Sequence, residues 1–255
     1  MPVSSCGSLY LWQKGGYPFN TLFLLDYYRG HHMILVIPDL LNKSDLGKIQ
    51  SLLEQGTFKD GKLTAGWHAR LVKNNQQLSS RDTVAQQAKA VLVRSLQQNA
   101  QFGLALQPRR MRPPLFSRYE AGMEYGFHVD DAIMGADRGL RTDVSFTVFL
   151  NDPDSYEGGE LVMDSPMGEQ KFKLPAGSAI TYPSTTLHKV APVTKGVRLV
   201  AVSWVQSLVR SAEQREILYD LDQVRRNLFD QEGKSRNFDL LSKNYANLLR
   251  LWSET

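Results

Sequence analysis

The stretch 141–163, RTDVSFTVFLNDPDSYEGGELVM, decides the fold class of this chain. Residues 143–150 and 159–163 have the composition of short strands, because β-branched and aromatic side chains recur there between Asn, Asp and Pro breakers. Gly158 and Gly159 supply the turn chemistry that joins strands, since glycine adopts backbone angles that other residues avoid. This stretch therefore predicts β structure built from short strands.

Short strands continue on both sides of this stretch. From Pro113 onward, Gly, Pro, Asn and Asp interrupt the apolar runs every few residues, and LPAGSAI (174–180) contributes another turn. Strands are predicted near 115–119, 124–131, 143–150, 159–163, 170–174, 178–182, 187–192 and 197–205. So many short strands within about 90 residues predict a sandwich, a barrel or a jelly roll.

Helical periodicity flanks the β region. An edge strand is predicted in MILVIPDLLN, and GWHARLV (66–72) is read as another strand. N-cap candidates are Asn42 or Ser44 for the first helix and Ser79 or Ser80 for the second. The predicted helices are 43–56, 81–99, 212–229 and 240–252, and the predicted apolar face of the third comprises Ile217, Leu218, Leu221, Val224 and Leu228.

The predicted fold class is α+β, with supporting helices, an all-β core and C-terminal helices. Residues 1–32 mix glycine, serine and aromatics without periodicity, so they are read as an irregular N-terminal extension. One hypothesis places the start of the compact domain, and of translation, at Met33. The remainder divides into a supporting region over 33–109, the β domain over 110–209 and C-terminal helices over 210–255. The apolar stripes of those last helices either pack on the core or form a dimer contact.

The composition is that of a globular protein. Of 255 residues, 42% are hydrophobic and 22% are charged, and the net charge is +4. This weakly basic balance favours anionic partners but does not indicate nucleic acid, and Arg109, Arg110 and Arg112 are read as a solvated loop. A single cysteine, Cys6, excludes an intramolecular disulfide and a cysteine-rich metal cage. No apolar run approaches the roughly 18 residues of a membrane span, so the default expectation is a cytoplasmic protein.

Two histidines and one aspartate form a candidate metal site. In YGFHVDDAIMG (125–135), strand alternation places His128 and Asp130 on one face and Asp131 on the other. His188 lies at a strand start, and the 57 residues between Asp130 and His188 are rich in β signals. Two histidines and a carboxylate with open coordination positions are typical of non-haem Fe(II) oxygenases. Two alternatives remain open at this point: a histidine packed in the core beside surface aspartates, and a hydrolytic zinc site.

The other histidines give weaker signals. His31 and His32 are neighbours in the irregular N-terminal segment, and adjacent residues do not easily converge on one metal. His68 lies in 66–72 and is read as packed or exposed. None of the three is therefore predicted to be a metal ligand.

A single arginine marks the strand after His188. In GVRLVAVSW, Arg198 shares a strand face with Val200, Val202 and Trp204. Burying a guanidinium without a partner costs free energy, so Arg198 either reaches water near the sheet edge or pairs with a carboxylate. The second reading suits its planar fork, which binds a carboxylate through two parallel hydrogen bonds.

These residues resemble the HxD…H…R signature of Fe(II)- and 2-oxoglutarate-dependent dioxygenases. The closer resemblance is to PKHD-type hydroxylases, bacterial proteins similar to prolyl 4-hydroxylases and often linked with iron uptake. HVD supplies His128 and Asp130, and LHKVAPVTKGVR supplies His188 and Arg198. The resemblance extends through PLFSRYEAGMEYGFHVD, RTDVSFTVFLNDPDSYEGGELVM and KLPAGSAITYPSTTLHKVAPVTKGVRLVAVSWVQS. It covers nearly the whole chain apart from 1–32, which falls outside the family pattern.

The resemblance implies a double-stranded β-helix, or jelly roll, with iron between its two sheets. His128, Asp130 and His188 would ligate Fe(II), and Arg198 would pair with the distal carboxylate of 2-oxoglutarate. By analogy with prolyl hydroxylases, Tyr119 would hydrogen-bond the same carboxylate. The resemblance also implies L-ascorbate as a further cofactor.

The implied activity couples O₂-dependent decarboxylation of 2-oxoglutarate to succinate with hydroxylation of a second substrate, in a role tied to iron homeostasis. That substrate is a prolyl or lysyl group or a small molecule of iron acquisition, and KNNQQ (73–77) is a candidate rim segment. Thr147, on the same strand face as Ser145, either lines the pocket or makes a structural cross-strand contact. The alternatives are a non-catalytic sensor of iron or 2-oxoglutarate on the same jelly roll, and a zinc hydrolase, which would not need Arg198.

Overall fold

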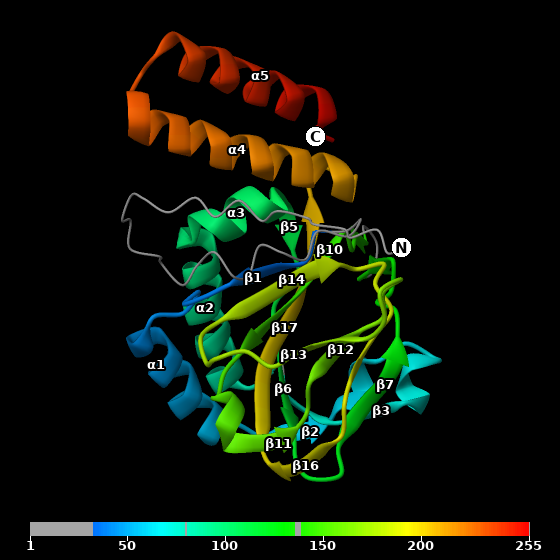
Figure 1. Cartoon of the computed structure of the whole chain (residues 1–255). Coiled ribbons are helices and arrows are strands. Elements are labelled where there is room, and N and C mark those ends of the chain that lie inside the picture. The colour runs from blue at the N-terminus through cyan, green and yellow to red at the C-terminus, as the bar shows by residue number, and fades with distance from the viewer. Residues whose placement is uncertain (1–32, 80, 136–138, 255) are drawn as a thin grey trace, which may run out of the picture.

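Two antiparallel β-sheets face each other at the centre of the molecule (Figure 1). The computed structural model describes residues 33–79, 81–135 and 139–254. The predicted extension over 1–32 lies outside the described residues. The arrangement of the two sheets is that of a jelly roll, so the predicted α+β fold class is confirmed.

The larger sheet has eight strands and the smaller has five. In pairing order the larger sheet contains β1 (Leu35–Ile37), β14 (Ala179–Pro183), β10 (Val144–Phe149), β17 (Arg198–Ser207), β6 (Leu115–Tyr119), β4 (Gln76–Leu78) and β2 (Phe58–Asp60), and β5 (Pro108–Met111) also pairs with β17. The smaller sheet contains β13 (Gln170–Phe172), β12 (Leu161–Met163), β15 (His188–Val190), β7 (Glu124–His128) and β3 (Lys73–Asn74). Two ribbons complete the strands, β11 (Tyr156–Gly158) with β16 (Val193–Gly196) and β8 (Ile133–Met134) with β9 (Leu140–Arg141).

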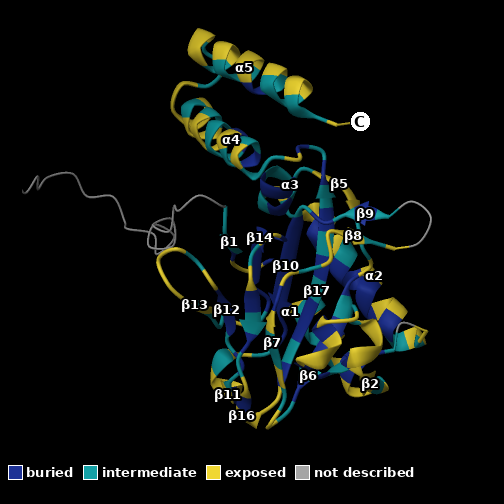
Figure 2. Ribbon diagram, turned by 90° about the vertical axis from the view of Figure 1, so that its right-hand side faces the viewer, coloured by how far each residue is buried: buried dark blue, intermediate teal, exposed yellow. Residues whose placement is uncertain are grey.

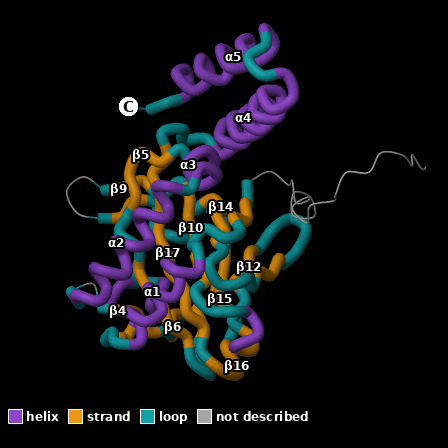
Figure 3. Tube along the Cα trace, turned by 90° about the vertical axis from the view of Figure 1, so that its left-hand side faces the viewer, coloured by secondary structure: helices purple, strands orange, loops and turns teal. Residues whose placement is uncertain are grey.

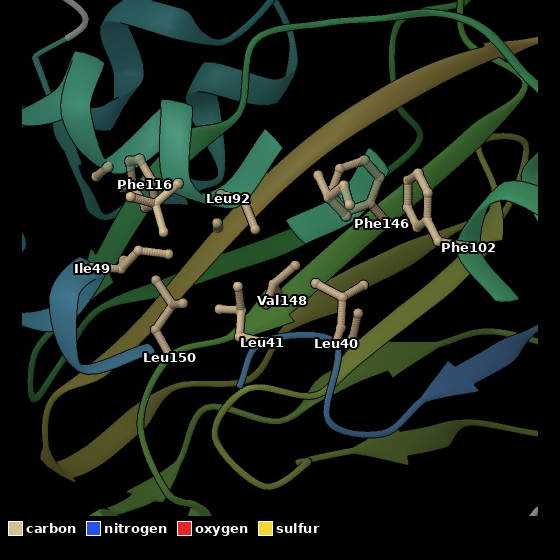
Figure 4. Close-up of a cluster of buried hydrophobic side chains, with 14 of the residues drawn as sticks. Leu40, Leu41, Ile49, Leu92, Phe102, Phe116, Phe146, Val148 and Leu150 are labelled. Atoms are coloured by element: carbon tan, nitrogen blue, oxygen red, sulfur yellow. The ribbon is translucent and has the colours of Figure 1, made fainter. Parts of the chain in front are cut away.

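Strand β10 lies in the middle of the larger sheet and is buried on both faces. On one face Phe146 and Val148 join the main hydrophobic core, where the Phe146 ring meets the Phe102 ring edge-on at 5.3 Å between centroids (Figure 4). Successive side chains of a strand point to opposite faces, so Ser145 and Thr147 face the space between the sheets. A single strand thus contributes both to the core and to the wall of the site.

Three helices cover the outer face of the larger sheet (Figure 3). They are α1 (Lys43–Glu54), α2 (Thr83–Gln98) and α3 (Ala100–Leu106), and short 3₁₀ turns lie at η2 (Gly61–Thr64), η3 (Ala69–Leu71) and η4 (Pro153–Ser155). Ile49 and Leu92 bury their side chains against the sheet in the same core as Phe116 (Figure 4). Burial of such side chains stabilises the fold by about 1.5–3 kcal/mol each, which holds the helices on the sheet.

Two C-terminal helices, α4 (Ala212–Glu232) and α5 (Arg236–Trp252), form an antiparallel pair at one end of the molecule (Figure 1). Leu218 of α4 is fully buried with Tyr245 of α5, but much of both helices is exposed (Figure 2). The apolar face predicted for α4 is therefore only partly right, since Ile217 and Val224 are 46% and 56% exposed. The dimer contact predicted for these helices stays a prediction.

Gly158 and Gly159 lie where β11 leads into β12, and both have left-handed backbone angles, with φ of 72° and 68°. A Cβ on Gly158 would lie 2.1 Å from the carbonyl oxygen of Pro192, and a Cβ on Gly159 would lie 3.0 Å from Cδ of Arg198. The turn predicted here is confirmed. The absence of a side chain at Gly159 also leaves room for the stem of Arg198.

Most predicted elements are confirmed, with local corrections. The strand predicted over 124–131 ends at His128, and the strand predicted over 66–72 is wrong, because that segment forms the 3₁₀ turn η3. Helix α1 has the predicted N-cap Asn42, but α2 is capped by Asp82, whose carboxylate accepts hydrogen bonds from the backbone N–H of Val84 and of Thr57. The segment read as a solvated loop around Arg109 and Arg110 is β5. The predicted boundary between 109 and 110 falls inside this strand.

Candidate active site

His128 and His188 face each other across neighbouring strands of the smaller sheet. His128 is the last residue of β7 and His188 the first of β15, and the two are register partners with ring centroids 4.3 Å apart. Asp130 follows β7, and its Oδ2 lies 4.0 Å from Nε2 of His188. One ligand atom from each of the three residues lies within 4.8 Å of the others. The structure therefore brings together the three predicted metal ligands.

Backbone carbonyls orient both imidazoles. Nδ1 of His128 donates to the carbonyl of Gly126, and Nδ1 of His188 donates to the carbonyl of Thr186, each at 2.9 Å. Because a carbonyl can only accept, the proton of each neutral ring is on Nδ1 and the lone pair of Nε2 is available to a metal. Burial, and then the neighbouring His188, lower the pKa of His128 below its usual value, which favours the neutral ring that a metal requires.

Asp130 is positioned by hydroxyl groups and not by a strand. Because β7 ends at His128, strand alternation does not extend to Asp130. Ser145 of β10 donates its Oγ hydrogen to Oδ2 of Asp130 at 2.6 Å, and Ser145 is in turn 2.8 Å from Oγ of Ser184. The predicted residue is thus correct, while its orientation comes from the opposite sheet. Asp131 is exposed and lies beside Gly66.

Arg198 is buried at the start of β17, with only 1% of its surface exposed. Its guanidinium lies over the ring of its register partner Tyr119, at 5.0 Å, and over the ring of Phe149, at 5.6 Å. Among the described residues, Nε and Nη1 have no hydrogen-bond partner, and no carboxylate oxygen lies within 4.0 Å of the guanidinium. The alternative in which Arg198 reaches water at a sheet edge is therefore wrong.

A cavity of about 740 Å³ connects the triad with Arg198. Leu161 and Val190 contribute apolar walls. Thr147 also lines the cavity, which is one of the two roles predicted for it. Tyr119 also lines it; burial raises the pKa of its hydroxyl, while the charge of Arg198 acts in the opposite direction.

The residues fit a metal and a dicarboxylate ligand. Three convergent nitrogen and oxygen donors leave room for further ligands on a metal, which suits Fe(II). The unpaired N–H groups of Arg198, at another part of the same cavity, match a carboxylate.

Comparison with known proteins agrees with this geometry. Residues 114–206 match the family model of the 2OG-Fe(II) oxygenase superfamily, and residues 213–254 match the C-terminal domain of PKHD-type hydroxylases. A PKHD-type hydroxylase of Synechococcus elongatus is 56% identical over 223 residues, which cover 87% of this chain and 100% of that relative. The chain belongs to the PKHD-type hydroxylase family. It is a 2-oxoglutarate-dependent dioxygenase, and its superfamily implies Fe(II) and 2-oxoglutarate.

Other relatives of this PKHD-type hydroxylase agree with that assignment. A PKHD-type hydroxylase of Thermosynechococcus vestitus is 53% identical over 223 residues, covering 87% of this chain and 100% of the relative. Among solved structures, a non-haem α-ketoglutarate-dependent carbocyclase from nogalamycin biosynthesis has a TM-score of 0.51 at 13% identity, covering 70% of this chain and 81% of that one. The second comparison shows the shared fold alone.

Several residues of this PKHD-type hydroxylase site carried no signal of their own in the sequence. Ser184 meets Ser145 only through the pairing of β14 and β10, and Tyr125 stacks on the His128 ring at 3.6 Å between centroids. Lys73, in the predicted rim segment, is buried in the cavity wall. The alternation of Ser145 with Thr147 was the one usable sequence signal for this wall.

His68 lies outside the cavity, with its ring edge-on to that of Trp67 at 5.1 Å between centroids. The pair His31 and His32 lies outside the described residues. Over the described part of the chain, no helix combines the length and the apolar character that spanning a membrane requires.

Proposed function

We propose that this PKHD-type hydroxylase holds Fe(II) through His128, Asp130 and His188 and binds 2-oxoglutarate through Arg198. In the same cavity it hydroxylates a second substrate, coupled to decarboxylation of 2-oxoglutarate to succinate. Fe(II) bound by two histidines and one carboxylate retains open coordination positions and supplies the redox chemistry with O₂. The protein supplies position, charge and exclusion of water.

The buried guanidinium of Arg198 carries this proposal. An unpaired buried cation is costly, so its presence beside a candidate metal site points to an anionic ligand that is absent from the protein chain. A carboxylate of 2-oxoglutarate would give this guanidinium the anionic hydrogen-bond acceptor that it lacks. Tyr119, beneath the guanidinium, would add a hydroxyl at the same end of the cavity. A zinc hydrolase would have no use for this arginine.

The chain's own groups fix the other contacts. The carbonyls of Gly126 and Thr186 hold the two imidazoles, and the Ser145 hydroxyl keeps one carboxylate oxygen of Asp130 hydrogen-bonded. Such outer contacts orient metal ligands. The apolar side chain of Leu161 helps to exclude water from the cavity.

The finer parts of the proposal rest on the family resemblance. They are a substrate that is a prolyl or lysyl group or a small molecule of iron acquisition, a role in iron homeostasis, and L-ascorbate as the reductant that maintains Fe(II). A cytoplasmic location and the division of the chain at residues 32, 109 and 209 remain predictions from composition and sequence pattern.

The test is anaerobic reconstitution of the protein with Fe(II) and 2-oxoglutarate, followed by O₂ and measurement of succinate across candidate substrates, with and without ascorbate. We expect O₂-dependent succinate that increases with the correct substrate and is lost in His188→Ala. The matched control Lys195→Ala, on the exposed strand β16, keeps wild-type turnover. Binding of both Fe(II) and 2-oxoglutarate without succinate formation would instead identify a non-catalytic sensor.

A further inference from the structure

A second buried cation lies in the cavity, on the sheet opposite Arg198. Lys73 belongs to β3 at the edge of the smaller sheet, whereas Arg198 belongs to the larger sheet. Only 6% of Lys73 is exposed, although lysine is rarely buried without a partner. Its register partner is Tyr125, whose ring stacks directly on His128. Lys73 is therefore one aromatic ring away from the metal site.

The ammonium of Lys73 is incompletely paired. Its Nζ donates to Oγ1 of Thr64 at 3.1 Å and lies 5.2 Å from the centroid of the Tyr125 ring. An ammonium has three N–H donors, so two remain. In the described part of the chain, no carboxylate oxygen lies within 4.0 Å of Nζ. The group is thus a buried cation that lacks an anionic partner.

The one acid of the site that attracts Lys73 would be engaged elsewhere. Burial lowers the pKa of Lys73 to about 8, and the charges of Asp130 and then of Asp60, which is not part of the cavity lining, partly oppose this effect. A negatively charged ligand beside Nζ would raise this pKa again and favour the charged ammonium. Once Asp130 ligates a divalent metal, its negative charge is compensated by the metal and no longer balances Lys73.

The cavity as a whole has an excess of positive charge. The charged residues that line it are Lys73, Lys89, Arg112, Arg198, Asp130 and Asp131. If Asp130 is assigned to the metal and Arg198 to 2-oxoglutarate, the remaining cations are Lys73, Lys89 and Arg112. Asp131 is then the one remaining acid among the described residues of the lining. A cavity with this charge favours an anionic ligand over a neutral one of the same shape.

We infer that Lys73 binds a carboxylate of the substrate that this enzyme hydroxylates, so that the substrate is a carboxylic acid. The inference rests on the function proposed above. One ammonium with two free N–H donors balances a single negative charge and matches the acceptor oxygens of a carboxylate. The stacked rings of Tyr125 and His128 fix the position of this contact relative to the metal, so Lys73 determines which part of the substrate faces the triad.

The test uses protein loaded with Zn(II) and N-oxalylglycine, a mimic of 2-oxoglutarate that occupies the position beside Arg198. Two probe pairs differ only in charge: N-acetylproline with N-acetylprolinamide, and phenylacetate with phenylacetamide. Ligand-observed NMR titration gives the Kd of each probe. We expect the wild-type protein to bind each carboxylate about tenfold or more tightly than its amide, because a charge-assisted hydrogen bond is gained.

Three variants isolate the role of Lys73. Lys73→Gln and Lys73→Met lose the preference for carboxylates while retaining the affinities for Zn(II) and N-oxalylglycine, which also shows that they are folded. Lys62→Gln, at an exposed lysine of the preceding turn, keeps the preference.

The inference is overturned if the wild-type protein binds both members of each pair equally, or if the preference survives in Lys73→Gln. It is also overturned if Lys73→Gln weakens N-oxalylglycine as strongly as Arg198→Ala does, since Lys73 would then belong to the cosubstrate site. Failure of the proposed function is distinguishable, because in that case N-oxalylglycine binding would not depend on Arg198 at all.

Discussion

Replacing Arg198 by methionine should separate the binding of 2-oxoglutarate from the stability of the fold. In the ligand-free protein, each unpaired buried N–H group of Arg198 costs about 1–3 kcal/mol, and methionine removes that cost. The same change removes two cation–π contacts, with Tyr119 and Phe149, worth roughly 2 kcal/mol each at a desolvated position. These effects offset, so the free energy of unfolding should change by less than about 2 kcal/mol.

The affinity for 2-oxoglutarate should respond very differently. Removing one partner of a buried, hydrogen-bonded charge pair costs about 3–5 kcal/mol, which corresponds to a Kd raised roughly 10²- to 4 × 10³-fold. Calorimetric titration of Zn(II)-loaded protein measures the Kd, and urea unfolding of the metal-free protein measures the stability. Arg118→Met is the matched control, because Arg118 lies on the neighbouring strand β6 and pairs with Glu120.

Either of two results would exclude Arg198 as the residue that binds 2-oxoglutarate without being needed for the fold. One is a Kd for 2-oxoglutarate within about threefold of wild type in Arg198→Met, since the loss of a pair that contributes several kcal/mol would raise the Kd much more. The other is a loss of more than about 4 kcal/mol of unfolding free energy, which would make Arg198 a structural residue.

Three further changes test the surroundings of the site. Ser145→Ala removes the hydroxyl donor to Asp130 and should weaken metal affinity about 10- to 100-fold in a Zn(II) titration; unchanged affinity would exclude an orienting role. Gly159→Ala places a Cβ against Arg198 at a left-handed backbone position, so both 2-oxoglutarate affinity and melting temperature should fall. Lys73 has its pKa lowered from 10.5 to about 8, so the unfolded chain binds more protons between these values. Lys73→Met should therefore exceed wild type in unfolding free energy below pH 8, by up to about 3 kcal/mol, and lose this advantage by pH 10.5; a pH-independent difference would contradict this.

The three candidate metal ligands could be predicted from the sequence, because residue type and the order of the strands were enough to select them. His128 and His188 are register partners in adjacent strands, and both strand segments were legible from short apolar runs between breakers. Asp130 was selected by alternation along a strand that in fact ends two residues earlier. The choice holds because Ser145 fixes the carboxylate, and that contact depends on the packing of two sheets. Local periodicity does not contain such information.

The residues that were missed depend on long-range pairing. Alternation placed Arg198 on a face with apolar neighbours, but only its register with Tyr119 shows that it is buried and not at an edge. Lys73 belongs to a two-residue strand, which is too short to give a period. For α2, several residues could cap the helix, and Asp82 is chosen because it also accepts a hydrogen bond from Thr57 in a distant turn.

The register pairing of His128 with His188 has a consequence for folding. These residues are 60 positions apart, and a metal held between them closes that span of chain as a cross-link. A covalent cross-link over such a span stabilises a protein by about 4 kcal/mol through loop-closure entropy. The strand pair also has a register irregularity between His188 and Val190. A bound metal would therefore act as a clamp that selects one alignment of β7 against β15, and chelators should loosen this end of the smaller sheet before the helical layer unfolds.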